Sequence, residues 1–249
     1  MNHPVIFGAC SAIVLWAASR VGAAVHKKKG PTPETAHEDL GFVVGAILTL
    51  LGLLIGFTFS MAISRYDQRK NYEEEEANAI GTEYLRADLL PAANAAKVRQ
   101  LLVKYLDQRT VWYETHDKAQ LAAVDAETAR LQDEMWAEVK SAAAAQPTPV
   151  TAVAVTGMND VLNTQGYTQA AWWNRIPTTA WVLMMLIALF CSFLIGFSAR
   201  QPSGSVFWIV PIAVSVSFML IADIDSPRTG LIRVIPQNLV NLSQSMQRQ

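Results

Sequence analysis

Four long stretches of this 249-residue sequence carry no charged side chain, or only one. They cover residues 4–25, 41–64, 176–199 and 201–222. A helix needs roughly 20 apolar residues to cross the hydrocarbon core of a bilayer, where backbone groups find no water to bond. None of the stretches alternates polar and apolar residues as the strands of a membrane barrel do. We therefore predict four transmembrane helices, the last of them over about 205–222.

The first stretch could be a retained helix or a cleaved signal peptide. No Lys or Arg precedes it, and its apolar run exceeds the roughly 7–15 residues of a signal core. Arg20 lies close enough to its end for the guanidinium to reach the interface, beside the lysines at 27–29. These flanks favour a retained helix.

The composition agrees with a membrane protein that has a water-exposed part. Charged residues make up 16% of the chain, where a soluble domain usually has about 25%. Hydrophobic residues make up 51%, and 20 Lys and Arg balance 21 Asp and Glu. This excludes a disordered chain, a collagen-like fibre, a disulfide scaffold and a basic nucleic-acid binder. We expect an all-α, multi-pass protein of the cell inner (plasma) membrane, with the lipid bilayer as a partner and no nucleic acid.

A polar stretch from Arg65 to Arg175 separates the second and third apolar stretches. No breaker follows Ser64, so the second helix should continue out of the membrane until Pro91 ends or kinks it. Further helices are expected over 92–114 and 118–145 and a fourth segment over 150–164, which together form a helical bundle. The expected domains are an N-terminal membrane hairpin (1–64), a soluble helical domain (65–175), a C-terminal membrane hairpin (176–225) and a tail (226–249). The tail is too short to span and should lie against the bundle or the membrane surface.

Small residues form a stripe along one edge of the second predicted membrane helix. At about 100° per residue, six positions fall in a sector of about 100°: Gly41, Gly45, Thr49, Gly52, Gly56 and Ser60. The usual use of such glycines is tight packing between helices. The alternative is a surface that lines a pore or faces another subunit.

Four successive glutamates, Glu73 to Glu76, raise the question of a metal site. They point around the whole circumference of a helix, and no Glu-x-x-His pair accompanies them as in a di-iron bundle. Arg69 and Lys70 precede Glu73 and Glu74 by four residues, which is the spacing of helical ion pairs. We therefore predict a solvated, salt-bridged face. Whether these glutamates meet a cation in an assembly stays open.

Asp223-x-Asp225 has the form of the acidic motif in metal-dependent sugar transfer, but so short a motif is most often structural. Ser226 and Pro227 form a turn beside it, so we predict a cap at a helix end, with Arg228 and Arg233 as ion-pair partners. The four histidines lack zinc spacing, and the sequence has no P-loop, Rossmann fingerprint or nucleophile elbow. We predict no catalytic residue, metal site or cofactor, and keep an enzyme using the two aspartates as a minor hypothesis.

Several segments resemble the bestrophin-like domain family, a set of mostly bacterial membrane proteins. They are Ser64-Arg65-Tyr66-Asp67, the stretch from Glu76 to Thr82, Leu89-Leu90-Pro91, Ile176-Pro177-Thr178-Thr179 and the stretch from Ile221 to Gly230. The motif residues carried by the resemblance are Arg65, Asp67, Glu76, Asn78, Pro91, Pro177, Asp223, Asp225, Pro227, Arg228 and Gly230. With the helix layout, the resemblance covers nearly the whole chain.

The resemblance implies an oligomeric ion channel, because the family is distantly similar to bestrophins, which are pentameric anion channels. By this analogy the second helix lines a central pore, and the helical domain extends the pore on the cytosolic side. The constriction of bestrophins consists of rings of aromatic side chains, and Phe42, Phe57 and Phe59 lie on the second helix here. The implied partners are further copies of the chain and a small inorganic ion.

A second hypothesis is a non-conducting, membrane-anchored interaction module that acts through the helical domain. The distribution of basic residues does not decide the orientation, with six near the membrane on the side of the helical domain and five on the other side. The resemblance favours a cytosolic helical domain.

Overall fold

The computed structural model describes residues 3–29, 34–199 and 206–248. Within these ranges the regular structure is helical, and no strand occurs. Four helical stretches there are long and apolar enough to cross a membrane: Pro4–Lys28, Glu38–Leu89, Pro149–Ser198 and Phe207–Ile224. The predicted fold class, an all-α membrane protein with four spans, is confirmed. The predicted start of the fourth span at residue 205 lies outside the described residues.

The chain divides into two compact units, which we call the membrane unit and the helical unit. The membrane unit comprises Met1–Arg65 and Arg175–Ile232, and the helical unit comprises Tyr66–Asn174 and Arg233–Gln249. The long helix α2 (Glu34–Arg86) contributes its first part to the membrane unit and its second part to the helical unit. It continues past Ser64 as predicted, because no breaker interrupts it there.

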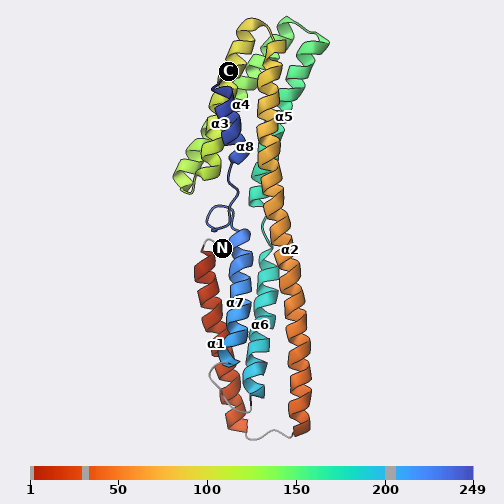
Figure 1. Cartoon of the computed structure of the whole chain (residues 1–249), viewed down its shortest axis with the longest axis vertical. Helices are drawn as coiled ribbons and strands as arrows, with labels where there is room; N and C mark the ends of the chain where they lie inside the picture. The colour runs from red at the N-terminus through yellow and green to blue at the C-terminus, as the bar shows by residue number, and fades with distance from the viewer. Residues whose placement is uncertain (1–2, 30–33, 200–205, 249) are drawn as a thin grey trace. The chain divides into compact units, whose positions relative to one another are not determined.

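In the membrane unit, α1 (Pro4–Lys29) packs along both α6 (Thr178–Ser198) and α7 (Val206–Ile224) (Figure 1). Aromatic side chains fill this contact. Phe7 meets the edge of Trp181 at a centroid distance of 5.3 Å, and Trp181 in turn meets Phe218 at 6.1 Å. Edge-to-face pairs of this kind add to the burial of the rings themselves.

In the helical unit, a 3-10 turn (Ala87–Leu89) follows α2 and leads into α3 (Ala92–Glu114), α4 (Lys118–Ala145) and α5 (Pro149–Trp173). The bounds of α3 and α4 are those predicted. Pro91 precedes α3, and Asp117 caps α4 by accepting a hydrogen bond from the Gln120 amide at 2.8 Å.

Helix α5 is longer than the predicted segment, which ended at residue 164. A capping box between Thr148 and Thr151 begins it, and no proline interrupts it until after Trp173. Its last turns bury Thr168, Ala171 and Trp172. The prediction stopped early because the polar residues around Gln165 hide this buried side.

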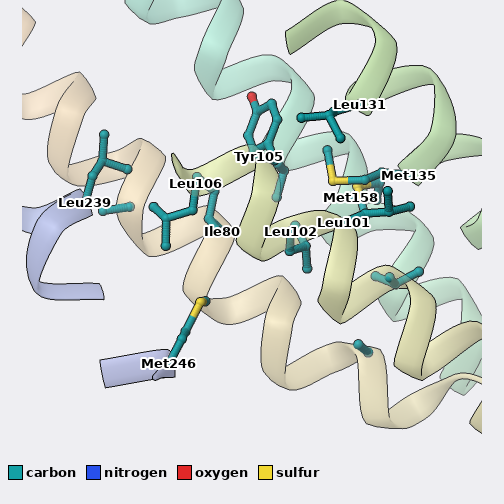
Figure 2. Close-up of a cluster of buried hydrophobic side chains, with 14 of the residues drawn as sticks. Ile80, Leu101, Leu102, Tyr105, Leu106, Leu131, Met135, Met158, Leu239 and Met246 are labelled. Atoms are coloured by element: carbon teal, nitrogen blue, oxygen red, sulfur yellow. The ribbon is translucent and has the colours of Figure 1, made fainter. Parts of the chain in front are cut away.

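The core of the helical unit is built from five helices. Fully buried side chains come from α2 (Ile80), α3 (Leu102, Tyr105, Leu106), α4 (Leu131, Met135), α5 (Met158) and the C-terminal helix α8 (Gln237–Met246; Leu239) (Figure 2). The tail therefore lies against the bundle, one of the two positions predicted for it. Apolar residues three and four apart on each helix supply this core.

Candidate functional site

Within the described residues, the small-residue stripe of α2 is not packed against another part of its own chain. An ideal Cβ built on Gly41, Gly45, Gly52 or Gly56 would meet no atom within 4 Å, the helix's own nearby backbone aside. Thr49 is exposed on the same stripe and donates its hydroxyl to the Gly45 carbonyl at 2.9 Å, so its polar group is satisfied within the helix. Ser60 is exposed as well.

The opposite side of this part of α2 is the packed side. Leu51, Thr58 and Ala62 are buried there, and at about 100° per residue they fall in a narrow sector far from the stripe. The exposed side also carries Phe42 and Phe57, which are 81% and 63% exposed. Phe59 is half-buried beside the stripe. This part of α2 thus offers a small-residue strip flanked by bulky apolar side chains.

A groove of about 290 Å³ runs between the stripe and α7. Gly52, Ile55, Gly56 and Phe59 of α2 line one side, and Ser217, Leu220 and Ile221 of α7 line the other. Because glycine has no side chain to fill this space, the groove stays open within one chain. It has the dimensions and apolar lining to receive side chains of a packed helix.

Tight packing between small residues does occur, but between α1 and α6. A Cβ on Gly196 would lie 1.9 Å from the Ser19 carbonyl oxygen, and a Cβ on Gly22 would lie 2.0 Å from the Phe193 carbonyl oxygen. Any side chain at either glycine would push the two backbones apart. This crossing was not predicted, although Ser192-x-x-x-Gly196 is a small-xxx-small pattern that indicates close approach of another helix.

Asp225 joins three segments at the end of the membrane unit. Both of its carboxylate oxygens accept from the Ile176 amide at 3.1 Å, and Arg65 of α2 lies 3.8 Å from Oδ1. Asp225 is buried, and its partner Arg65 is a motif residue expected from the resemblance. Arg233 was one of the two ion-pair partners predicted for the aspartates. Arg233 instead contacts the His116 ring.

Asp223 closes the turn that follows α7. Its two oxygens accept from the amides of Leu231 and Ile232 at 2.7 and 2.9 Å. Gly230 belongs to the same turn, where a Cβ would lie 2.3 Å from the Asp223 carbonyl oxygen. Both aspartates therefore act as structural caps, as predicted. In the described part of the chain, no three His, Cys, Asp or Glu side chains lie together as a metal site would require.

The glutamate run of α2 is half buried, so the predicted solvated face is wrong for two of its members. Glu73 and Glu76 are buried, while Glu74 and Glu75 are exposed. Residues three apart share one face of a helix, and this face packs against the bundle. The prediction failed because the partners of Glu73 and Glu76 come from distant segments.

Glu76 is the centre of a buried polar network. It forms an ion pair with the fully buried Arg109, and its Oε2 accepts from the Tyr113 hydroxyl at 3.2 Å and from Thr168 at 3.1 Å. The guanidinium also lies over the Trp112 ring, 4.5 Å from its centroid. Burial raises the pKa of Tyr113, and the charge of Glu76 raises it further. Tyr113 is therefore a hydrogen-bond donor at any physiological pH.

Glu73 caps α8 from another helix. Its Oε1 accepts from the amides of Asn238 and Leu239 at 2.9 and 3.0 Å, and Oε2 accepts from the Asn238 side chain at 2.6 Å. Pro236 occupies the N-cap position of α8 and provides no side-chain cap. The carboxylate of Glu73 replaces that cap and also suits the positive end of the helix dipole.

The remaining motif residues lie on α2, at helix starts and in the turn after α7. Asp67 and Asn78 are exposed on α2, and Pro91 is the N-cap residue of α3. Pro177 takes the same position before α6, Pro227 is buried in the turn after α7, and Arg228 is half-buried. The prolines therefore set helix starts and turns.

Comparison with known proteins shows a family to which the sequence matches and solved structures that have a similar fold. The family model described as Bestrophin-like domain matches residues 5–239. No curated protein matches the chain. Among solved structures, a mutated bacterial Bestrophin homolog from Klebsiella pneumoniae is 13% identical, with a TM-score of 0.70 over 100% of this chain and 97% of that one. A second mutated form is 14% identical, with a TM-score of 0.66 over 97% of this chain and 99% of that one. At these identities the structures show a shared fold.

Proposed function

The chain belongs to the Bestrophin-like domain family, and on this premise we propose that copies of it assemble in the membrane into an ion-conducting pore. In this proposal α2 lines the pore or forms the contact between subunits. The conducted species is a small inorganic ion. The observation that carries the proposal is the small-residue stripe of α2, at whose four glycines an added Cβ would meet no atom within 4 Å.

Burial supports the need for a second copy. In the most apolar 18-residue segment of α2, only 6% of the residues are buried within the chain. In the corresponding segment of α7, 50% are buried. Small residues on a membrane helix permit close approach of another backbone, which stabilises association through dispersion contacts. Four helices are too few to pack a core and enclose a hydrated pore, so the open stripe has a use only in an assembly.

Ion flux into liposomes tests the proposal. Gly52→Leu and Gly56→Leu place a branched side chain in the stripe and should change flux or the number of associated chains. Ala17→Leu is the matched control, because Ala17 is an exposed small residue on α1. Wild-type flux and wild-type association in both glycine variants would refute a role for the stripe.

We also propose that the helical unit lies on the cytosolic side, in the inner (plasma) membrane, as the family resemblance implies. A cysteine at the exposed Glu75, introduced into a variant in which Cys10 and Cys191 are replaced by Ala, reports this. A membrane-impermeant thiol reagent should label it in inside-out vesicles and not in intact cells. Labelling in intact cells would show that the helical unit lies on the outer side of the membrane and would contradict this orientation.

A non-conducting interaction module remains the second hypothesis, and one observation favours it. A groove of about 270 Å³ between α2 and α8 is lined by Tyr84, Leu85, Leu242 and Met246 among others, and Leu85 is 62% exposed. Crosslinking from Glu75 distinguishes the two hypotheses. Crosslinks confined to other copies of the chain support the pore, whereas a specific heterologous partner supports the module.

A further inference from the structure

Glu83 is a buried carboxyl group without a hydrogen-bond partner. Its side chain is 0% exposed, and neither of its oxygens has a partner among the described residues. An ionised carboxylate in such a place loses its hydration and gains no hydrogen bond in return, whereas the neutral acid loses much less. Glu83 is not part of the hydrogen-bond network around Glu76, so that network does not account for its burial.

The carboxyl lies directly against the backbone of α5. A Cβ built on Gly157 would lie 2.0 Å from Glu83 Oε2 and 2.6 Å from Arg86 Nη1. A side chain at this position would have to displace the ends of Glu83 and Arg86. Glu83 is therefore part of the contact between α2 and α5, and any movement of its carboxyl changes that contact.

Two charged groups face Glu83, one from each helix. Arg86 lies on the next turn of α2, and Asp160 lies on α5, with Arg86 Nη1 4.0 Å from Asp160 Oδ2. Burial has the largest effect and raises the pKa of Glu83. The charge of Arg86 lowers this pKa and the charge of Asp160 raises it, and the resulting pKa is about 8. The positive charge of Arg86 does not cancel the effect of burial on the pKa of Glu83, because the negative charge of Asp160 also lies beside Arg86.

We propose that Glu83 is a proton-binding site of the helical unit, occupied while α2 and α5 are in contact, and that loss of this proton to water weakens the contact. The neutral acid fits against Gly157 without a partner. The carboxylate requires water or a cation, and it reaches either only by moving away from Gly157. The contact between α2 and α5 therefore weakens as pH rises.

The direction of the effect on stability follows from the two states of the chain. An unfolded glutamate loses its proton near the ordinary value of 4.5, whereas folded Glu83 keeps it up to about 8. The folded state therefore binds more protons between these values, and the contribution of Glu83 to stability falls as pH rises through this window. The loss levels off above about pH 8.

The test compares the full-length protein in detergent with Glu83→Gln, in which the amide imitates the neutral acid, and with Glu75→Gln as an exposed control on the same helix. Amide hydrogen exchange of residues 154–161 is measured between pH 6 and 9.5. At each pH the exchange rate of the wild type is divided by that of Glu83→Gln, which removes the intrinsic pH dependence of exchange. We expect the wild-type rate to rise severalfold relative to Glu83→Gln between pH 6 and about pH 8, and the ratio to level off above about pH 8. Glu75→Gln should follow the wild type. A constant ratio between wild type and Glu83→Gln would overturn the proposal.

A second measurement needs no stable variant at the glutamate. Infrared spectroscopy of the wild type should show the carbonyl band of a neutral, non-hydrogen-bonded carboxylic acid at pH 7, and this band should disappear by pH 9.5. No such band at pH 7 would contradict the proposal. Neither test depends on conductance, so they stand or fall separately from the proposed pore.

Discussion

At the scale of the residue, Asp225 shows how one carboxylate organises the end of the membrane unit. It holds the amide that precedes α6, follows the last turn of α7 and pairs with Arg65 of α2. The sequence was sufficient to predict a structural cap here, because Ser226 and Pro227 mark a turn. It was not sufficient to predict Arg65 as the partner, because only the fold brings that arginine close.

Asp225→Asn should destabilise the protein while keeping the shape of the side chain. The variant loses the negative charge that Arg65 and the Ile176 amide contact, and hydrogen bonds to charged groups contribute about 1.5–3 kcal/mol. A lower midpoint of thermal unfolding in detergent would show this. Asp67→Asn is the control, since Asp67 is exposed on α2. Equal midpoints for the two variants would contradict the role of Asp225.

At the scale of the element, the ends of the helices could be predicted far better than their buried faces. Pro91 placed the start of α3 correctly, because such signals act within a few residues. The burial of Glu73 and Glu76 could not be predicted, because their partners come from α3, α5 and α8. A run of glutamates indicates a solvated helix unless the partners are known.

The buried ion pair between Glu76 and Arg109 predicts a strong asymmetry between single and double substitutions. Arg109→Met alone leaves an uncompensated buried carboxylate, which typically costs about 3–5 kcal/mol. Glu76→Leu combined with Arg109→Met removes both charges, and its cost should be clearly smaller than the sum of the two single changes. Chemical unfolding followed by circular dichroism measures this, with Glu74→Gln as the exposed control. Additive effects would show that the two residues do not act as a pair.

The cap on α8 predicts a local effect. Glu73→Gln weakens the acceptor for the Asn238 and Leu239 amides, and loss of an N-cap costs about 1 kcal/mol, or roughly fivefold in an equilibrium. Amides in residues 237–246 should therefore exchange about fivefold faster, whereas those of α4 keep their rate. Unchanged exchange in α8 would mean that packing of Leu239 and Met246 alone holds the helix.

At the scale of the whole molecule, glycines of two kinds should behave differently. Gly196→Leu places a side chain where the α1 backbone approaches, so the membrane unit should fail to fold and the protein should aggregate or be degraded. A Cβ at Gly52 would meet no atom within 4 Å, and the groove beside α7 leaves room for a longer side chain, so in Gly52→Leu the fold should persist while assembly changes. Fluorescence-detected gel filtration with circular dichroism separates the two outcomes. A folded Gly196→Leu protein, or an unfolded Gly52→Leu protein, would contradict this division.

The stripe could be located from the sequence alone, but its use could not. Glycines spaced by four residues predict close approach of another backbone without saying whether it belongs to the same chain. The structure assigns the close approach within the chain to Gly22 and Gly196 and leaves the α2 stripe open. That another copy of the chain packs on this stripe is the proposal that a measurement of assembly tests.

The mass of the purified complex in detergent, from light scattering with the detergent subtracted, tests the central proposal most directly. One chain has a mass of 27.3 kDa. An assembly around a pore predicts a single species whose protein mass is a whole multiple of this value, large enough for several copies of α2 to surround an axis. A protein mass of one chain, unchanged across concentrations and mild detergents, would contradict the pore and favour the interaction module.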